Sequence, residues 1–141
     1  MDEKFYFDTS IWLDFLEKRN EPNLPKGEWA KKLVERIINS NNKILFSDVN
    51  MLELGGVGYS EFEIEELIEG FQGLLIYIES SESEIGKARD LSQKRDVPKQ
   101  DALHALIARD NKSILVTLDS HFKKLEDISK PHSPKEFIGS S

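Results

Sequence analysis

The change of pattern that decides the fold occurs over residues 5–16, Phe5-Tyr6-Phe7-Asp8-Thr9-Ser10-Ile11-Trp12-Leu13-Asp14-Phe15-Leu16. The aromatic residues at its start favour a buried strand, and Asp8 ends that strand. Apolar residues then recur at the spacing of a helix, with Thr9 or Ser10 as its cap. A strand that leads directly into such a helix is typical of folds in which helices pack on a sheet.

The same alternation of strands and helices continues along the chain. Further strands are predicted at 43–46, 74–78 and 113–118. One helix is predicted to end near residue 39, and others are predicted at 49–54, 62–71, 83–95 and 98–111. A short capped turn or helix is predicted at 133–138. The predicted strands are short and mostly apolar, as in parallel sheets that are buried on both faces. We therefore predict an α/β fold whose ligands bind beyond the carboxyl ends of the strands, where the strand order reverses.

Length and composition are those of one globular domain. The 141 residues are 38% apolar and 32% charged, so a single domain is expected over residues 1–141. No apolar run approaches the roughly 20 residues that a membrane helix needs, and Met1-Asp2-Glu3-Lys4 does not begin a secretory signal, so we expect no membrane partner and a cytoplasmic location. The absence of cysteine excludes a disulfide framework, a Cys-ligated zinc site and a thiol nucleophile.

The net charge of −7 is unevenly distributed. Taken alone, the excess of acidic residues argues against a nucleic-acid partner, because phosphate repels it. However, residues 1–86 contain 18 acidic and 8 basic side chains, whereas residues 87–141 contain 8 acidic and 11 basic ones. The balance therefore does not exclude RNA, but it predicts weak binding that depends on salt and on metal ions.

Four carboxylates occupy unusual places in this pattern. Asp8 and Asp119 each follow a predicted strand, where an acid can also simply cap a helix or begin a loop. Glu53 interrupts an apolar helix turn, or else is a partly exposed side chain on a short helix. Asp101 heads an otherwise apolar row of its helix, although an acid is also favourable in a first helical turn.

Four carboxylates in one crevice would raise one another's pKa, and a divalent cation removes that conflict. Oxygen ligands suit Mg²⁺ or Mn²⁺. Hydroxyls at Ser10 and Thr117 lie two residues from an acid and could orient carboxylates or a water molecule, although both also suit ordinary cap or strand-end positions. The residues alone thus lead to a hypothesis of a metal site.

Four stretches resemble, in order, the motifs of the PIN domain family. They are Phe7-Asp8-Thr9-Ser10-Ile11-Trp12-Leu13, Ser47-Asp48-Val49-Asn50-Met51-Leu52-Glu53-Leu54, Pro98-Lys99-Gln100-Asp101-Ala102-Leu103-His104-Ala105 and Val116-Thr117-Leu118-Asp119-Ser120-His121-Phe122. Each motif is weak alone, but the ordered set is specific and spans residues 7–122. The size and the Asp-Ala-Leu-His sequence look most like the VapC-type toxin ribonucleases.

The resemblance implies a three-layer α/β/α sandwich around a parallel sheet of four or five strands. It implies metal-dependent cleavage of RNA phosphodiester bonds, with one or two Mg²⁺ or Mn²⁺ ions and an acidic cluster of Asp8, Glu53, Asp101 and Asp119. Glu53 would either ligate a metal or position the attacking water. A homodimer and a small antitoxin partner are also implied. The chain departs from many relatives in its acidic balance and in the glycine-rich segment 55–58.

The basic second part of the chain offers candidate contacts to single-stranded or loop RNA, although most of these residues also suit a solvated surface. The candidates are Lys87, Arg89, Lys94, Arg95, Lys99, Lys123 and Lys124. His104 is expected to pack on a helix face or at an interface, and His121 to pack or cap after Asp119.

Other functions fit the residues less well. A haloacid-dehalogenase-like phosphatase would need a second Asp where this chain has Ser10, and a response-regulator-like receiver would need an acid pair at its first strand. A housekeeping PIN ribonuclease in RNA processing and a catalytically silent PIN-like binding module remain as alternatives. The presence of all four acids argues against the silent module, since a scaffold has no need of their repulsion.

Overall fold

The computed structural model describes residues 3–139 and contains one five-stranded sheet. The strands are β1 (Lys4–Phe7), β2 (Lys43–Ser47), β3 (Leu75–Ile78), β4 (Ile114–Val116) and β5 (Pro131–His132). Their order across the sheet is β3-β2-β1-β4-β5, and each neighbouring pair is parallel. The predicted parallel α/β sheet is therefore confirmed.

Helices connect the strands. They are α1 (Thr9–Glu17), α2 (Lys26–Asn39), α3 (Asp48–Gly56), α4 (Glu61–Gly70), α5 (Glu82–Arg95) and α6 (Lys99–Asp110), with two short 3₁₀ helices, η1 (Ser120–Leu125) and η2 (Pro134–Phe137). Serine side chains cap α3, α4 and α5 through reciprocal capping boxes, at Ser47, Ser60 and Ser81. Within residues 3–139, none of these helices has the length and apolar character needed to cross a membrane.

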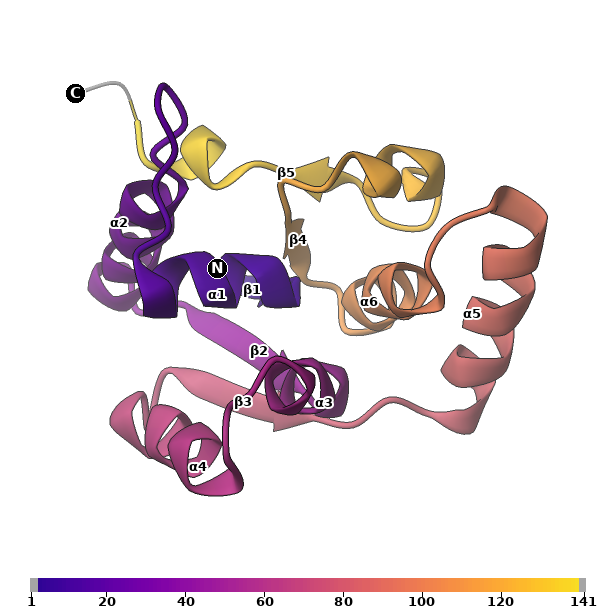
Figure 1. The fold of residues 1–141 in the computed structure, drawn as a ribbon, viewed down its shortest axis with the longest axis horizontal. Helices are drawn as coiled ribbons and strands as arrows, with labels where there is room; N and C mark the ends of the chain where they lie inside the picture. Colours follow the sequence, from indigo (N-terminus) through magenta and orange to yellow (C-terminus); the bar gives the residue numbers. More distant parts are fainter. Residues whose placement is uncertain (1–2, 140–141) are drawn as a thin grey trace.

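Side chains alternate between the two faces of the sheet and so build two separate cores. In β1, Phe5 and Phe7 enter one core together with residues of α1, α2 and α4, whereas Tyr6 enters the other core with residues of α5, α6 and η1. Figure 1 shows α1, α2 and α4 on one side of the sheet and α5 and α6 on the other. This is the expected three-layer α/β/α sandwich.

The fifth strand is the element that the residues alone did not predict. It contains only two residues, Pro131 and His132, and is paired with β4 at the edge of the sheet. A proline is tolerated there because an edge strand can leave one side of its backbone unpaired. β4 is also shorter than the predicted strand 113–118, since it ends at Val116.

The strand order reverses at β1, which lies between β2 and β4. The connections from the strands on either side of this point run to opposite sides of the sheet. In parallel sheets, ligands bind beyond the carboxyl ends of the strands at such a point. Asp8 follows β1 directly, and Asp119 lies three residues after the end of β4. The topology thus brings residues more than 100 positions apart to one edge of the sheet.

Candidate functional site

Asp8 is fixed at the junction of β1 and α1. Its side chain is the N-cap of α1, and its Oδ1 accepts hydrogen bonds from Ile11 N at 3.1 Å and Ser10 Oγ at 2.8 Å. Its Oδ2 accepts a hydrogen bond from Thr117 Oγ1 at 2.6 Å. Burial raises the pKa of Asp8 above its usual value, although these hydrogen bonds act in the opposite direction.

Thr117 joins the ends of β1 and β4. While its hydroxyl donates to Asp8, the same oxygen accepts a hydrogen bond from Asp119 N at 3.0 Å. Asp119 in turn is the N-cap of η1, where its Oδ1 accepts from His121 N at 2.8 Å. The two strand-end acids are therefore held in fixed positions by one threonine, and Ser10 orients the first of them. That Ser10 and Thr117 support a metal site stays a prediction.

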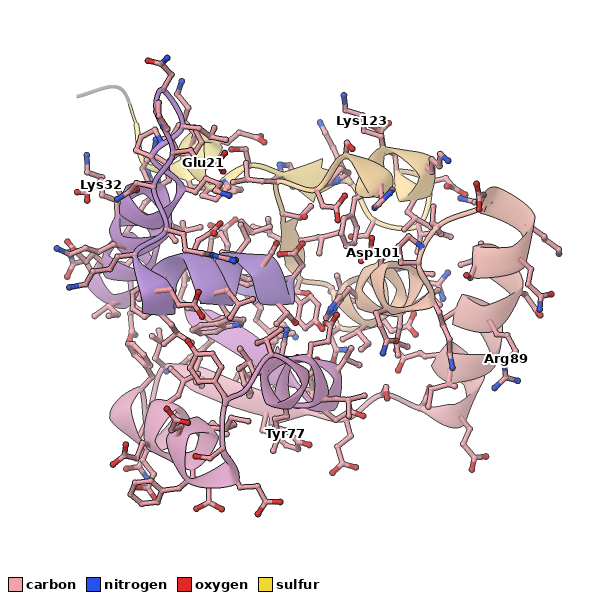
Figure 2. All side chains as sticks on the ribbon, viewed as in Figure 1. Glu21, Lys32, Tyr77, Arg89, Asp101 and Lys123 are labelled. Carbon is pink, nitrogen blue, oxygen red and sulfur yellow. The ribbon has the colours of Figure 1, made fainter. Side chains whose placement is uncertain are left out.

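Asp101 approaches these acids from the first turn of α6, which Figure 2 shows beside the segment that follows β4. Burial raises the pKa of Asp101 to about 6, and the negative charge of Asp119 contributes in the same direction. Its Oδ2 is buried and has no hydrogen-bond partner among residues 3–139. A buried carboxylate oxygen without a donor is costly in a folded protein, and a bound cation would satisfy it.

The donor atoms around Asp101 fit a divalent cation. Atoms of Asp101, Asp119 and His121 all lie within 4.8 Å of one another. Two carboxylates and one imidazole are ligands of Mn²⁺ and other first-row divalent ions, and Mg²⁺ would use the carboxylates and water. Asp8 is outside this group of three, but its charge also raises the pKa of Asp101, so it lies close by.

Glu53 belongs to a different set of contacts. Its Oε1 lies 2.5 Å from His104 Nε2 and accepts a hydrogen bond from Thr9 Oγ1 at 2.7 Å. Burial acts to raise the pKa of Glu53, but His104 and Thr9 outweigh it, so the pKa lies below its usual value. The structure therefore places Glu53 in contact with His104 of α6 rather than within the closest group of carboxylates.

His104 is the residue that the sequence predicted to pack on a helix face or at an interface. It is almost completely buried, which agrees with packing on a helix face, but both of its ring nitrogens have polar partners. Nδ1 lies 2.6 Å from the hydroxyl of Tyr6, which lies 2.7 Å from Ser47 Oγ. His104 follows Asp101 by one helical turn and also contacts Glu53. It therefore connects the group around Asp101 with Glu53. That three-residue spacing is the only sequence signal that could have indicated this role.

The basic candidates are not equally placed. Arg95 donates to both carboxylate oxygens of Asp127, at 2.6 and 2.9 Å, so it is engaged in an ion pair. Figure 2 shows Arg89 on the outer side of α5, far from Asp101. Lys99, in contrast, begins α6 two residues before Asp101 and is exposed, as are Lys123 and Lys124 in η1.

The fold is similar to that of chains in solved toxin–antitoxin complexes. A chain of VapBC2 from Rickettsia felis, solved bound to a DNA fragment from its promoter, is 21% identical with a TM-score of 0.66, covering 92% of this chain and 98% of that one. A chain of VapBC-1 from nontypeable Haemophilus influenzae is 20% identical with a TM-score of 0.65, covering 94% and 98%. A chain of a toxin–antitoxin complex from Klebsiella pneumoniae is 21% identical with a TM-score of 0.61, covering 92% and 97%.

No curated protein matches the sequence itself. The model of one domain family does match, and it covers residues 5–128, which include all four predicted acids. This match agrees with the strand order and with the acids at the strand ends. The chain belongs to the PIN domain family.

Proposed function

We propose that this protein is a divalent-metal-dependent endoribonuclease that acts as the toxin of a toxin–antitoxin pair. The observation that carries the proposal is the buried Oδ2 of Asp101, which has no hydrogen-bond partner among residues 3–139 and belongs to a donor group within 4.8 Å. Membership of a family whose members are generally nucleases supports this chemistry. The function is expected in the cytoplasm, where the RNA substrate is.

Some residues of the site would bind metal ions, and others would orient those residues. Asp101 and Asp119 would hold one or two ions, with Asp8 beside them in the orientation fixed by Thr117. A bound Mg²⁺ or Mn²⁺ supplies positive charge against phosphate oxygens and lowers the pKa of a water molecule, so that water can act as nucleophile at neutral pH. Glu53 is kept ionised by its lowered pKa, and it would either bind an ion or orient the attacking water.

The substrate class follows from charge and access. Lys99, Lys123 and Lys124 are the exposed bases nearest in sequence to Asp101 and Asp119, and they would contact phosphates. Single-stranded or loop RNA fits better than a duplex, because unstacked nucleotides can approach acids that lie at the ends of the strands. Attack by water would leave a 5′-phosphate and a 3′-hydroxyl.

The test is cleavage of a labelled RNA pool by the purified chain with Mn²⁺, Mg²⁺ or EDTA. We expect cleavage only with metal, a loss of at least about a hundredfold in Asp119→Asn, and an unchanged rate in Asp90→Asn, an exposed acid on α5. Cleavage that persists in EDTA would contradict the metal dependence. Metal binding without cleavage of any RNA would instead favour a silent binding module.

An acidic, apolar groove supports a protein partner. The groove has a volume of about 570 Å³ between α3, α4 and β3, and it is lined by Asp48, Met51, Leu52, Gly55, Gly56, Tyr59, Glu61, Ile64, Glu65 and Tyr77. Leu52 is 67% exposed, which is unusual for a large apolar side chain. Three of the lining residues are acidic, so the fitting occupant is a basic amphipathic segment of an antitoxin.

Binding measurements with the product of a neighbouring small reading frame test this partner. Leu52→Asp should weaken the complex at least about tenfold, while Leu24→Asp, on a loop near α2, should leave it unchanged. Equal affinity of both variants would contradict the assignment of the groove. Cleavage activity without any small basic partner would favour a housekeeping ribonuclease. Light scattering checks the expected homodimer, at about twice the 16.2 kDa chain mass.

A further inference from the structure

His121 lies in a position that its sequence context did not indicate. It is the second residue of η1, and its backbone N donates to Asp119 Oδ1, which turns the chain back over the end of β4. The next residue, Phe122, is fully buried and anchors η1 in the core. The side chain of His121 itself is 49% exposed, so neither packing nor capping accounts for where its ring points.

The ring of His121 points toward the carboxylates. Its Nδ1 lies 3.0 Å from Asp119 Oδ1 and 3.4 Å from Asp101 Oδ2. Two donors that are each about 2.1 Å from one ion lie about 3.0 Å apart at octahedral angles and about 3.4 Å apart at tetrahedral angles. The observed separations of 3.0 and 3.4 Å match those expected for neighbouring ligands on a single cation, although 3.0 Å is also an ordinary ion-pair distance.

A simple ion pair explains the contacts less well. A charged imidazole that served only to neutralise the two acids would donate a hydrogen bond to the oxygen that lacks one. Asp101 Oδ2 has no hydrogen-bond partner among residues 3–139, even though Nδ1 is only 3.4 Å away. The nitrogen thus lies close to this oxygen without donating a hydrogen bond to it.

We propose that His121 is a metal ligand through Nδ1, together with Asp101 and Asp119, and that it makes the site prefer Mn²⁺ to Mg²⁺. This inference rests on the proposed metal-dependent function. An imidazole nitrogen binds Mn²⁺ and later first-row ions well, whereas Mg²⁺ strongly prefers oxygen ligands. Loss of the nitrogen should therefore weaken Mn²⁺ binding much more than Mg²⁺ binding.

The experiment compares the full chain with His121→Phe, which keeps an aromatic ring without nitrogen. The matched control is His132→Phe, since His132 pairs with Glu136 and packs against Phe137. Electron paramagnetic resonance measures Mn²⁺ affinity, Mg²⁺ affinity follows by competition, and electron spin echo modulation detects nitrogen bound to Mn²⁺. We expect the nitrogen signal in the wild type and the control but not in His121→Phe. That variant should bind Mn²⁺ about tenfold more weakly, with Mg²⁺ affinity changed less than about threefold.

The outcomes separate this inference from the function on which it rests. Mn²⁺ binding without a nitrogen signal, or with a signal that persists in His121→Phe, would overturn the assignment of His121 and leave a metal-dependent ribonuclease intact. Equal Mn²⁺ affinities of wild type and His121→Phe would mean that His121 forms an ion pair only. No Mn²⁺ binding to the wild type at millimolar concentration would overturn both proposals.

Discussion

Replacing Asp101 by asparagine should stabilise the metal-free protein. Burial and the charge of Asp119 raise the pKa of Asp101 from 3.8 to about 6, which corresponds to about 3 kcal/mol of stability lost when the carboxyl is ionised in the folded state. Partial exposure of the side chain reduces this to about 1.5 kcal/mol. Asparagine also loses the favourable interaction of a negative charge with the first turn of α6, which costs about 0.5 kcal/mol of stability. We therefore expect Asp101→Asn to be about 1 kcal/mol more stable than the wild type.

The gain must depend on pH with a definite sign. A raised folded-state pKa means that the folded protein binds more protons than the unfolded one between about pH 3.8 and 6. The ionisation penalty of the wild type is therefore absent below this range, grows through it, and is complete above about pH 6. Asp101→Asn should thus show its full advantage at pH 7.5 and about a third of it at pH 4.5.

Urea unfolding in EDTA, followed by circular dichroism, measures these differences. Asp90→Asn, which removes an exposed acid from α5, is the matched control and should change stability by less than about 0.5 kcal/mol. Adding Mn²⁺ should reverse the order, because the ion stabilises only the form that binds it well. An Asp101→Asn variant that is less stable than the wild type in EDTA at pH 7.5 would refute the reasoning.

Three further predictions use other parts of the structure. Gly27→Ala should destabilise the fold by about 2 kcal/mol in urea unfolding, because an added Cβ would lie 2.7 Å from the backbone of Lys18, whereas Gly86→Ala, in open space inside α5, should stabilise it by about 0.5–1 kcal/mol. Tyr6→Phe should cost about 1–3 kcal/mol in the same assay, since it leaves the buried His104 Nδ1 without its partner and removes a hydrogen bond to Ser47 Oγ, and an unchanged midpoint would contradict that network. Asp8→Asn should retain less than about a tenth of RNA cleavage, a loss of more than about 1.4 kcal/mol, and greater residual activity would exclude a direct role in metal binding.

Local patterns predicted most of the fold. Phe5-Tyr6-Phe7 followed by helical spacing identified β1 and α1, because strand formers and helical periodicity act over a few residues. The cap was predicted wrongly, since α1 is capped by Asp8 and not by Thr9 or Ser10. The closing turn at Ser133 was likewise found from its proline and capping box. β5 was missed because two residues at a sheet edge carry no periodic signal.

The candidate site was predictable where an acid broke a local pattern, and only there. Asp8 and Asp119 ended strands, and Glu53 interrupted an apolar turn, so each could be identified from its neighbours in sequence. The partner of Glu53, in contrast, is His104, 51 residues later, and that contact depends on how α3 and α6 pack. The direction of the His121 ring likewise depends on the turn in which the backbone N of His121 donates to Asp119 Oδ1. The types of these residues alone do not specify that direction.

The polar groups around Glu53 and those around Asp101 differ in how completely they are hydrogen-bonded. This difference distinguishes residues that support the site from residues that we expect to bind a ligand. Around Glu53, the carboxylate, imidazole and hydroxyl groups form a continuous set of contacts that runs through Ser47 and Asn50 and returns to Glu53 through Thr9. Around Asp101, by contrast, a buried oxygen lacks a donor and a neighbouring acid raises its pKa. A fold under selection for stability alone would replace such a residue, because asparagine removes the repulsion with little change in shape. The destabilised part is therefore where we expect a ligand to bind, and the same substitution that stabilises the protein should abolish metal binding.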